Sequence, residues 1–263
     1  MEVGDVMFNK RRRLYKRKKL LLFVTLSLVL FLGIGYSAVK DNILVSSGAT
    51  FSPVPMVKST SLEDTKYFRN SKYKKLIKII TFEDRINVPS NATESWDIGV
   101  NQNGDVMAYV IPNTIDSSYY DLYIQANGKV YANKNMSSWF RSMDAVECIN
   151  NIELLDTRYT TNMSHMFTYL GKIASSVTLD VSSFNTSKVT NMSNMFNNVG
   201  SDSLDVNITL GDIDSSKVTD MSGMFYRTGF SDQTFTLDVS SLETNNVVDM
   251  KNMFKETGKK STL

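Results

Sequence analysis

Two aspartates, Asp180 and Asp238, come nearest to an arrangement that could do chemistry. Each lies in the same pentapeptide context, L-D-V-S-S, two repeat units apart. Paired carboxylates carry out glycoside hydrolysis. If each unit adds one strand, the two carboxylates lie about 10 Å apart, near the outer limit of about 9.5 Å for an inverting pair. A structural role explains their recurrence more simply, so we expect no catalytic residues and no enzyme activity.

A second set of polar residues recurs in register and offers oxygen atoms to a cation. Calcium requires several oxygen ligands, typically carboxylates in a D-x-D-x-D-G loop, and this sequence has no such loop. We therefore expect these side chains to cap short helices or to satisfy backbone groups at turns. They form an amide and carboxylate column of Asn162, Asn191, Asp220 and Asp249, and a hydroxyl column of Thr157, Thr186, Ser215 and Thr244.

Cysteine and histidine are too scarce for metal chemistry. The single cysteine, Cys148, excludes an intrachain disulfide framework and is typical of a small buried residue. The single histidine, His165, leaves no His/Cys cluster for zinc or iron. We predict no metal and no cofactor.

The elements that position these residues belong to an internal repeat. The hexapeptide N-M-S-N-M-F ends at Phe196, and close variants end at Phe167, Phe225 and Phe254, always 29 residues apart. A degenerate unit, N-M-S-S-W-F, ends at Phe140. A fixed period of this length indicates stacked units, because one unit cannot bury its apolar side alone.

Within each unit the hydrophobic period changes. Val189, Met192 and Phe196, with Met195 beside them, have the i, i+3, i+7 spacing of a short helix. We therefore predict an α/β repeat solenoid, leucine-rich-repeat-like, with one short strand and one short helix per unit over residues 135–263. The strands are predicted from alternating triplets: Cys148/Asn150/Ile152, Val177/Leu179/Val181, Val206/Ile208/Leu210 and Phe235/Leu237/Val239.

The preceding residues divide into two further segments. Residues 76–134 contain alternating apolar runs and predict a small β-rich module of four or five strands. Within it, Asn127-Gly128 is a favoured two-residue hairpin turn. Residues 40–75 are rich in Ser, Thr and Lys, contain S-P-V-P, and predict an extended linker or stalk.

The N-terminal residues predict that the protein is exported from the cytoplasm. Residues 1–19 carry eight Lys/Arg against two acidic residues, a local charge of +6, and Leu20–Val39 contains no charge. About 20 apolar residues span a bilayer as a helix, and flanking positive charge keeps its end in the cytoplasm. We expect a single-pass membrane protein with residues 40–263 extracellular. The alternative is a secreted protein released by signal cleavage, although Tyr36 is bulky for a cut after Ala38.

The repeats resemble a known family. The units L-D-V-S-S-F-N-T-S-K-V-T-N-M-S-N-M-F (179–196) and L-D-V-S-S-L-E-T-N-N-V-V-D-M-K-N-M-F (237–254) are similar to those of the BspA-like leucine-rich repeat surface proteins of bacteria. The likeness covers roughly residues 76–256. It implies a cell-surface protein with a leucine-rich-repeat-like solenoid, often assumed to mediate adhesion or protein contacts, without catalytic residues. The present units are longer than the common repeat of about 25 residues.

Taken together, these features predict a membrane-tethered surface module for adhesion or for protein or glycan interaction. Its partners are the membrane, through Leu20–Val39, and an extracellular protein or glycan. Exposed aromatics are the candidate binding residues: Tyr169, Tyr226 and Phe230. The alternatives are a non-binding structural spacer of the cell envelope and a secreted glycan-active enzyme. Nucleic-acid binding is not expected, because a flanking apolar segment accounts for the basic residues.

Overall fold

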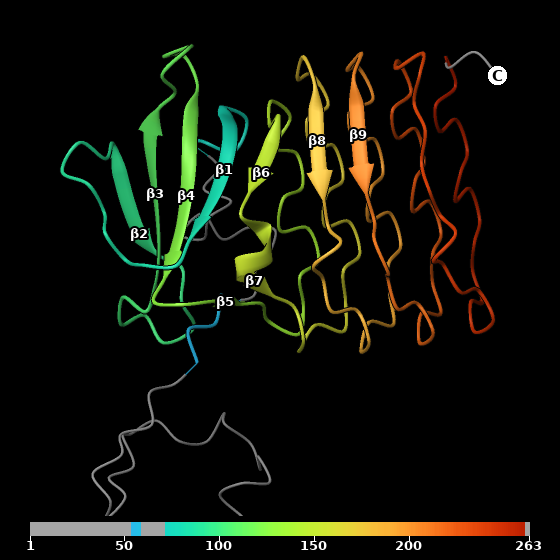
Figure 1. Cartoon of the computed structure of the whole chain (residues 1–263), viewed down its shortest axis with the longest axis horizontal. Helices are drawn as coiled ribbons and strands as arrows, with labels where there is room; N and C mark the ends of the chain where they lie inside the picture. Colours follow the sequence, from blue (N-terminus) through green and yellow to red (C-terminus); the bar gives the residue numbers. More distant parts are fainter. Residues whose placement is uncertain (1–53, 59–71, 261–263) are drawn as a thin grey trace, which may run out of the picture. The chain divides into compact units, whose positions relative to one another are not determined.

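The computed structural model describes residues 54–58 and 72–260. The chain divides into two units, Met1–Val54 and Pro55–Leu263, and all described residues except Val54 belong to the second. The second unit is built on a mixed seven-stranded sheet in the order β2-β3-β4-β1-β6-β8-β9 (Figure 1).

Both strand orientations occur in this sheet. The antiparallel part consists of β2 (Glu94–Asp97), β3 (Val106–Pro112) and β4 (Tyr120–Ala126). The parallel part begins with the pairing of β4 and β1 (Ile77–Glu83) and continues through β6 (Cys148–Asn150), β8 (Val177–Asp180) and β9 (Val206–Thr209). A separate parallel pair joins β5 (Val130–Tyr131) to β7 (Leu155–Asp156).

The predicted hairpin turn at Asn127-Gly128 is wrong. The chain bends here and Gly128 has a φ of 92°, but Asn127 is not among the residues with a positive φ, which a two-residue Asn-Gly hairpin turn requires at both positions. However, the strands on either side of it do not pair with each other: β4 lies between β3 and β1, and β5 pairs with β7. The bend therefore carries the chain from one sheet to the other.

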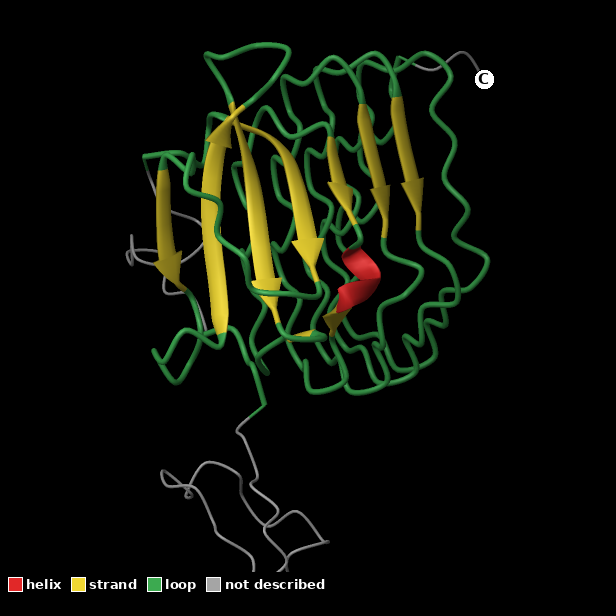
Figure 2. Ribbon diagram, turned by 60° about the vertical axis from the view of Figure 1, so that its left-hand side comes forward, coloured by secondary structure: helices red, strands yellow, loops and turns green. Residues whose placement is uncertain are grey.

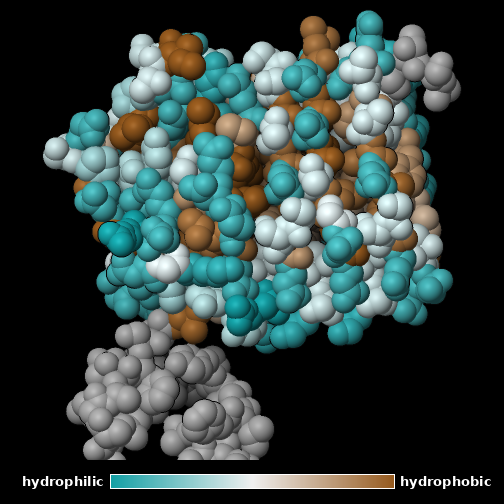
Figure 3. Space-filling model, viewed as in Figure 1, coloured by the Kyte–Doolittle hydropathy of each residue, from teal (hydrophilic) through white to brown (hydrophobic). Residues whose placement is uncertain are grey.

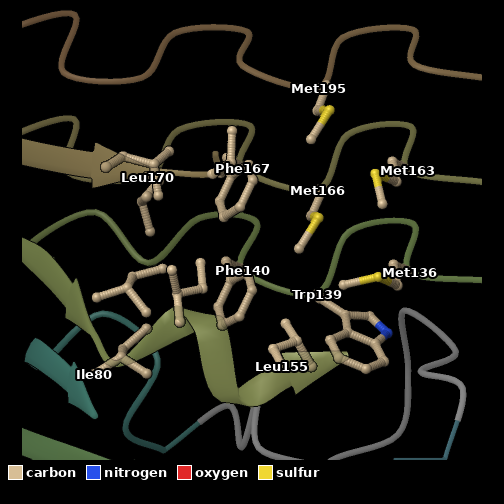
Figure 4. Packing of buried hydrophobic residues seen from close by; sticks show 14 of the residues in the cluster. Ile80, Met136, Trp139, Phe140, Leu155, Met163, Met166, Phe167, Leu170 and Met195 are labelled. Atoms are coloured by element: carbon tan, nitrogen blue, oxygen red, sulfur yellow. The ribbon is translucent and has the colours of Figure 1, made fainter. Parts of the chain in front are cut away.

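The hydrophobic core lies between the sheet and the methionine and phenylalanine segments of the repeats (Figures 2 and 4). Phe140, Phe167, Phe196 and Phe225 are 0% exposed, and their rings stack one on the next. The methionines of the same segments fill the neighbouring columns, as Figure 4 shows for Met136, Met163, Met166 and Met195. The prediction that the repeated Met/Phe residues form the core is confirmed for these units.

The predicted α/β fold is wrong, because the Met/Phe segments are not helical. Across the described residues the structure is mostly β, and its one helix is the three-residue 3₁₀ helix η2 (Ile152–Leu154). In each hexapeptide the fourth residue is left-handed, with φ between 55° and 61° at His165, Asn194, Gly223 and Asn252. Such a residue cannot continue a right-handed helix. The helix is replaced by turns in which the third residue has a positive φ.

Backbone hydrogen bonds show how these turns stack. The N–H of Met195 donates to the carbonyl of Met192 at 3.1 Å and closes a turn within the unit. The next N–H, on Phe196, donates to the carbonyl of Met224 in the following unit at 2.8 Å. Because these two kinds of bond alternate along the segment, each unit satisfies its own turns and is joined to its neighbour.

The predicted strands differ in detail from the observed ones. In β6 the buried residue is Ile149, whereas Cys148 is half-buried and Asn150 exposed. Cys148 is paired with Thr178, so this unit is out of step by one residue with the triplet register. Residues 235–239 of the last triplet form no strand.

The single-pass membrane topology also requires correction. In the part of the chain that the structure describes, no helix has the length and apolar character needed to cross a bilayer. The predicted span, Leu20–Val39, lies outside the described residues, as do the basic segment 1–19 and most of the linker 40–75.

Candidate functional site

The outer face of the seven-stranded sheet carries a continuous row of polar and aromatic side chains. Strand register places Tyr109 beside Tyr123, Tyr123 beside Thr81, and Thr81 beside Asn150. The pairing of Cys148 with Thr178 then brings Asn150 level with Asp180, which is paired with Thr209. Neighbouring strands are about 4.8 Å apart, so this row, which crosses six strands, is about 24 Å long.

Exposure along this row changes from one end to the other. Asn150, Asp180 and Thr209 are exposed, whereas Tyr123 is half-buried and Tyr109 is only 5% exposed. The two tyrosine rings stack with centroids 4.8 Å apart and planes 3° from parallel. Figure 3 shows the molecule from this side, with hydrophilic residues spread over the face and apolar residues between them.

A hollow of about 550 Å³ lies at the tyrosine end of the row. This volume is within the range of small-ligand sites, about 300–1,000 Å³. Its lining is mainly polar and offers both donors and acceptors, from Glu83, Arg85, Asn87, Tyr109, Gln125 and Asn151. Since Tyr109 belongs to both, the hollow and the row form one candidate surface.

Gln125 fixes the shape of the hollow. Its side chain is 1% exposed and donates to the carboxylate of Glu83 at 2.5 Å. Its carbonyl oxygen accepts from the backbone N–H of Asn87 at 3.1 Å. Because a buried amide that loses its partners is costly, these bonds hold the segment after β1 against the sheet.

The tyrosines of this surface remain neutral donors. Burial raises the pKa of Tyr109, and the nearby Glu83 carboxylate raises it further. Burial also raises the pKa of Tyr123, with a smaller contribution from Asp121. Both hydroxyls are therefore protonated at neutral pH. That of Tyr109 donates to the Glu83 carboxylate at 3.5 Å, whereas that of Tyr123 can donate to an oxygen of a ligand.

The carboxylates considered for catalysis accept hydrogen bonds from backbone N–H groups. Asp180 accepts a hydrogen bond from the N–H of Ser182, and Asp238 from that of Ser240, each at 2.9 Å. Asn162, Asn191, Asp220 and Asp249 each accept in the same way from the residue two positions on, at 2.8–2.9 Å. Within the described residues, no group of three His, Cys, Asp or Glu side chains is placed to hold a metal ion.

Two members of the hydroxyl column, Thr157 and Ser215, also bond the backbone. Thr157 donates to the carbonyl of Asn185 at 3.0 Å and accepts from its N–H at 2.8 Å. Ser215 makes the same pair of bonds with Glu243. Thr186 is equally buried, yet its hydroxyl has no partner within the described residues.

The aromatic residues proposed as binding residues lie in the turns of the repeats and are not part of the row on the sheet face. Tyr169, Tyr226 and Phe230 are all half-buried. Lysines lie 5.9 Å from the ring centroids of Tyr169 and Tyr226, and the Arg227 guanidinium lies 3.9 Å from that of Phe230. Cations thus cover these rings in part, and the three residues remain candidates only.

Burial favours the neutral form of both the single cysteine and the single histidine. Burial raises the pKa of the Cys148 thiol, with smaller contributions from Glu147 and Asp121, so little thiolate forms at neutral pH. Burial lowers the pKa of His165, and Arg141 lowers it further. The ring of His165 is therefore neutral at pH 7.

The repeat region matches the model of a protein family. Residues 134–262 match the family model described as "Mycoplasma protein of unknown function, DUF285". The repeat region is a DUF285 domain. The DUF285 match includes the degenerate unit ending at Phe140 and the four regular units, together with strands β6 to β9. No significant match was found among curated proteins or solved structures.

The row on the sheet face was not identified from the sequence, although part of its signal is present. Along β3 and β4 the alternation that buries Ala108, Val110, Leu122 and Ile124 leaves Tyr109 and Tyr123 for the opposite face. What the sequence does not give is the order of the strands, which places these tyrosines next to β1 and hence in line with the DUF285 units.

Proposed function

We propose that this chain is a recognition module whose outer sheet face binds an extended glycan. The observation that supports it is the row from Tyr109 to Thr209, with the hollow at its tyrosine end. Hydroxyl, amide and carboxylate groups together both donate and accept hydrogen bonds, which matches the hydroxyl groups of a sugar chain.

A glycan fits this face better than a peptide strand does. The backbone groups of inner strands are already bonded within the sheet, so only side chains are available on its face. Peptides that bind by strand addition need a free edge. The resemblance of the repeats to BspA-like surface proteins gives additional support, since adhesion is the role assumed for that family.

Binding to soluble polysaccharides tests the proposal. The full chain is immobilised and titrated with dextran, chito-oligosaccharides and hyaluronan in surface plasmon resonance. Asn150→Trp and Thr209→Trp place a bulky ring on the row at exposed positions, and each is expected to weaken binding at least tenfold. Thr190→Trp, also exposed but outside the row, is the control and is expected to bind as the unaltered chain does.

Three outcomes would count against the proposal. If none of these polysaccharides binds, or if Thr190→Trp weakens binding as much as Thr209→Trp, the row is not the binding surface and a spacer role is favoured. If sugar reducing ends accumulate and Asp180→Asn stops their release, the chain is an enzyme.

A further inference from the structure

The hollow at the tyrosine end of the row is lined by more acidic groups than basic ones. Its lining contains the carboxylates of Glu83 and Asp84 and a single cation, Arg85. Among the described residues, neither carboxylate belongs to an ion pair. A concave site with an excess of one charge concentrates ligands of the opposite charge, so the hollow favours a positively charged group.

One oxygen of the Glu83 carboxylate is held in place, and the other is available to a ligand. Oε2 accepts from the amide of Gln125 at 2.5 Å and from the hydroxyl of Tyr109 at 3.5 Å. Within the described part of the chain, Oε1 accepts no hydrogen bond, and Glu83 is only half-buried. Because Gln125 and Tyr109 are themselves buried, they fix the carboxylate and leave Oε1 for a donor in the hollow.

Asp84 and Asn151 supply two further acceptors from the lining. The backbone carbonyl of Asp84 is held by the N–H of Gly128 at 2.8 Å, while its side chain is exposed. The amide nitrogen of Asn151 donates to the carbonyl of Phe82 at 3.0 Å, which leaves its amide oxygen free to accept from a ligand. An ammonium group has three N–H donors and no acceptor. Three acceptors in one hollow match it.

The row that leads away from the hollow adds negative charge and no positive charge. Asp180 is exposed on β8, and the N–H of Ser182 bonds one oxygen of its carboxylate. The other residues of the row are tyrosine, threonine and asparagine, which are uncharged at neutral pH. A chain that carries positive charges is therefore attracted along the row as well as at the hollow, whereas a polyanion such as hyaluronan is repelled.

From these observations we propose that the hollow selects an amino sugar with a free, protonated amine, so that the glycan held on this face is a cationic chain of the glucosamine type. The ammonium group donates to Glu83, Asp84 and Asn151. The guanidinium of Arg85, which has donors and no acceptor, bonds hydroxyl oxygens of the same sugar.

N-acetylation of the sugar removes this match. An acetylated amine has no charge and a single N–H, so it satisfies at most one of the three acceptors and leaves two carboxylates without a cation. Hydrogen bonds to charged groups are the stronger ones, so the free amine is preferred. This inference rests on the proposed binding of glycans by the sheet face, and it adds which class of sugar is bound.

Two matched ligands test the inference: the hexasaccharide of glucosamine and its fully N-acetylated form. Surface plasmon resonance measures the binding of each to the immobilised full chain at pH 5.5, where the amines are protonated and ordinary carboxylates are largely ionised. The glucosamine form is expected to bind at least tenfold more tightly. Glu83→Gln and Asp84→Asn are each expected to reduce this preference at least threefold without weakening the binding of the N-acetylated form, and circular dichroism checks that both variants fold.

Glu243→Gln is the matched control, because it makes the same change in net charge at an exposed residue outside the hollow and the row; it is expected to keep the preference. If both hexasaccharides bind equally tightly and Asn150→Trp weakens both, the glycan proposal stands and the selection of amino sugars is overturned. If neither binds, the glycan proposal fails and this inference fails with it. A preference that both hollow variants leave unchanged, or that Glu243→Gln reduces as much as they do, overturns the assignment to the hollow.

Discussion

The rings of Phe196 and Phe225 lie face to face, with centroids 5.3 Å apart and planes 3° from parallel. Both side chains are 0% exposed, although they belong to different repeats. Equivalent contacts extend the stack to five rings, from Phe140 to Phe254, at spacings of 5.3–5.5 Å. The stack therefore couples each repeat to the next through the core.

We expect Phe196→Ala to lower the free energy of unfolding by about 3–5 kcal/mol, because it removes a buried ring and leaves a cavity. Phe254→Ala should cost less, since that ring is 46% exposed and has one stacking neighbour. Urea denaturation of both variants measures the difference. Equal losses would mean that the stack does not stabilise the inner repeats more than the end.

The repeat period and the buried Met/Phe columns were predictable because identical spacing places like residues at like sites. The helix was not, since the i, i+3, i+7 spacing of Val189, Met192 and Phe196 is also that of a run of turns. The distinguishing signal is the fourth hexapeptide position, where Asn194, Gly223 and Asn252 tolerate a positive φ. Intrinsic helix propensity alone predicts that asparagine or glycine at this position is only mildly unfavourable to a helix.

The site was less predictable than the fold, because it depends on pairings between distant segments. Nothing local in the sequence indicates that Thr81 lies between Tyr123 and Asn150. The residues were visible in the sequence, and their spatial relation was not.

Gly200 tests the requirement for left-handed residues in the repeat turns. Its φ is 55°, and an added Cβ would lie 2.5 Å from a Val206 methyl group. We expect Gly200→Ala to destabilise the fold by more than the left-handed cost alone, which is about 1–2 kcal/mol. Asn194→Gly is the control, because Gly223 occupies the equivalent site in the next unit. Thermal unfolding should show a large shift only for Gly200→Ala, and no shift there would contradict the steric argument.

Gln125 tests how the hollow is held. Gln125→Leu removes the acceptor of the Asn87 N–H and the amide donor to the Glu83 carboxylate, so we expect a loss of about 1–3 kcal/mol in stability. Hydrogen exchange at Asn87 should become faster as the segment after β1 loosens. Thr178→Leu, exposed on the same sheet, should leave both stability and exchange nearly unchanged. Unaltered exchange in Gln125→Leu would show that other contacts hold this segment.

His165 makes the stability of the fold depend on pH. Burial lowers its pKa below the ordinary value of 6.5, and Arg141 lowers it further, while Asp220 acts in the opposite sense. As the pH falls through 6.5, the unfolded chain takes up a proton at this position before the folded chain does. Stability from the neutral ring is therefore complete above the unfolded pKa and is lost as the pH falls toward the folded pKa.

His165→Asn removes this titration and keeps the turn, because asparagine occupies the same left-handed site at Asn194 and Asn252. The unaltered chain should lose stability relative to His165→Asn between pH 7.5 and pH 5.5, a range in which ordinary carboxylates remain largely ionised. Urea unfolding of both proteins at several pH values measures the difference, and groups common to both cancel. A stability difference that is constant across this range would mean that His165 ionises equally in the folded and unfolded chains.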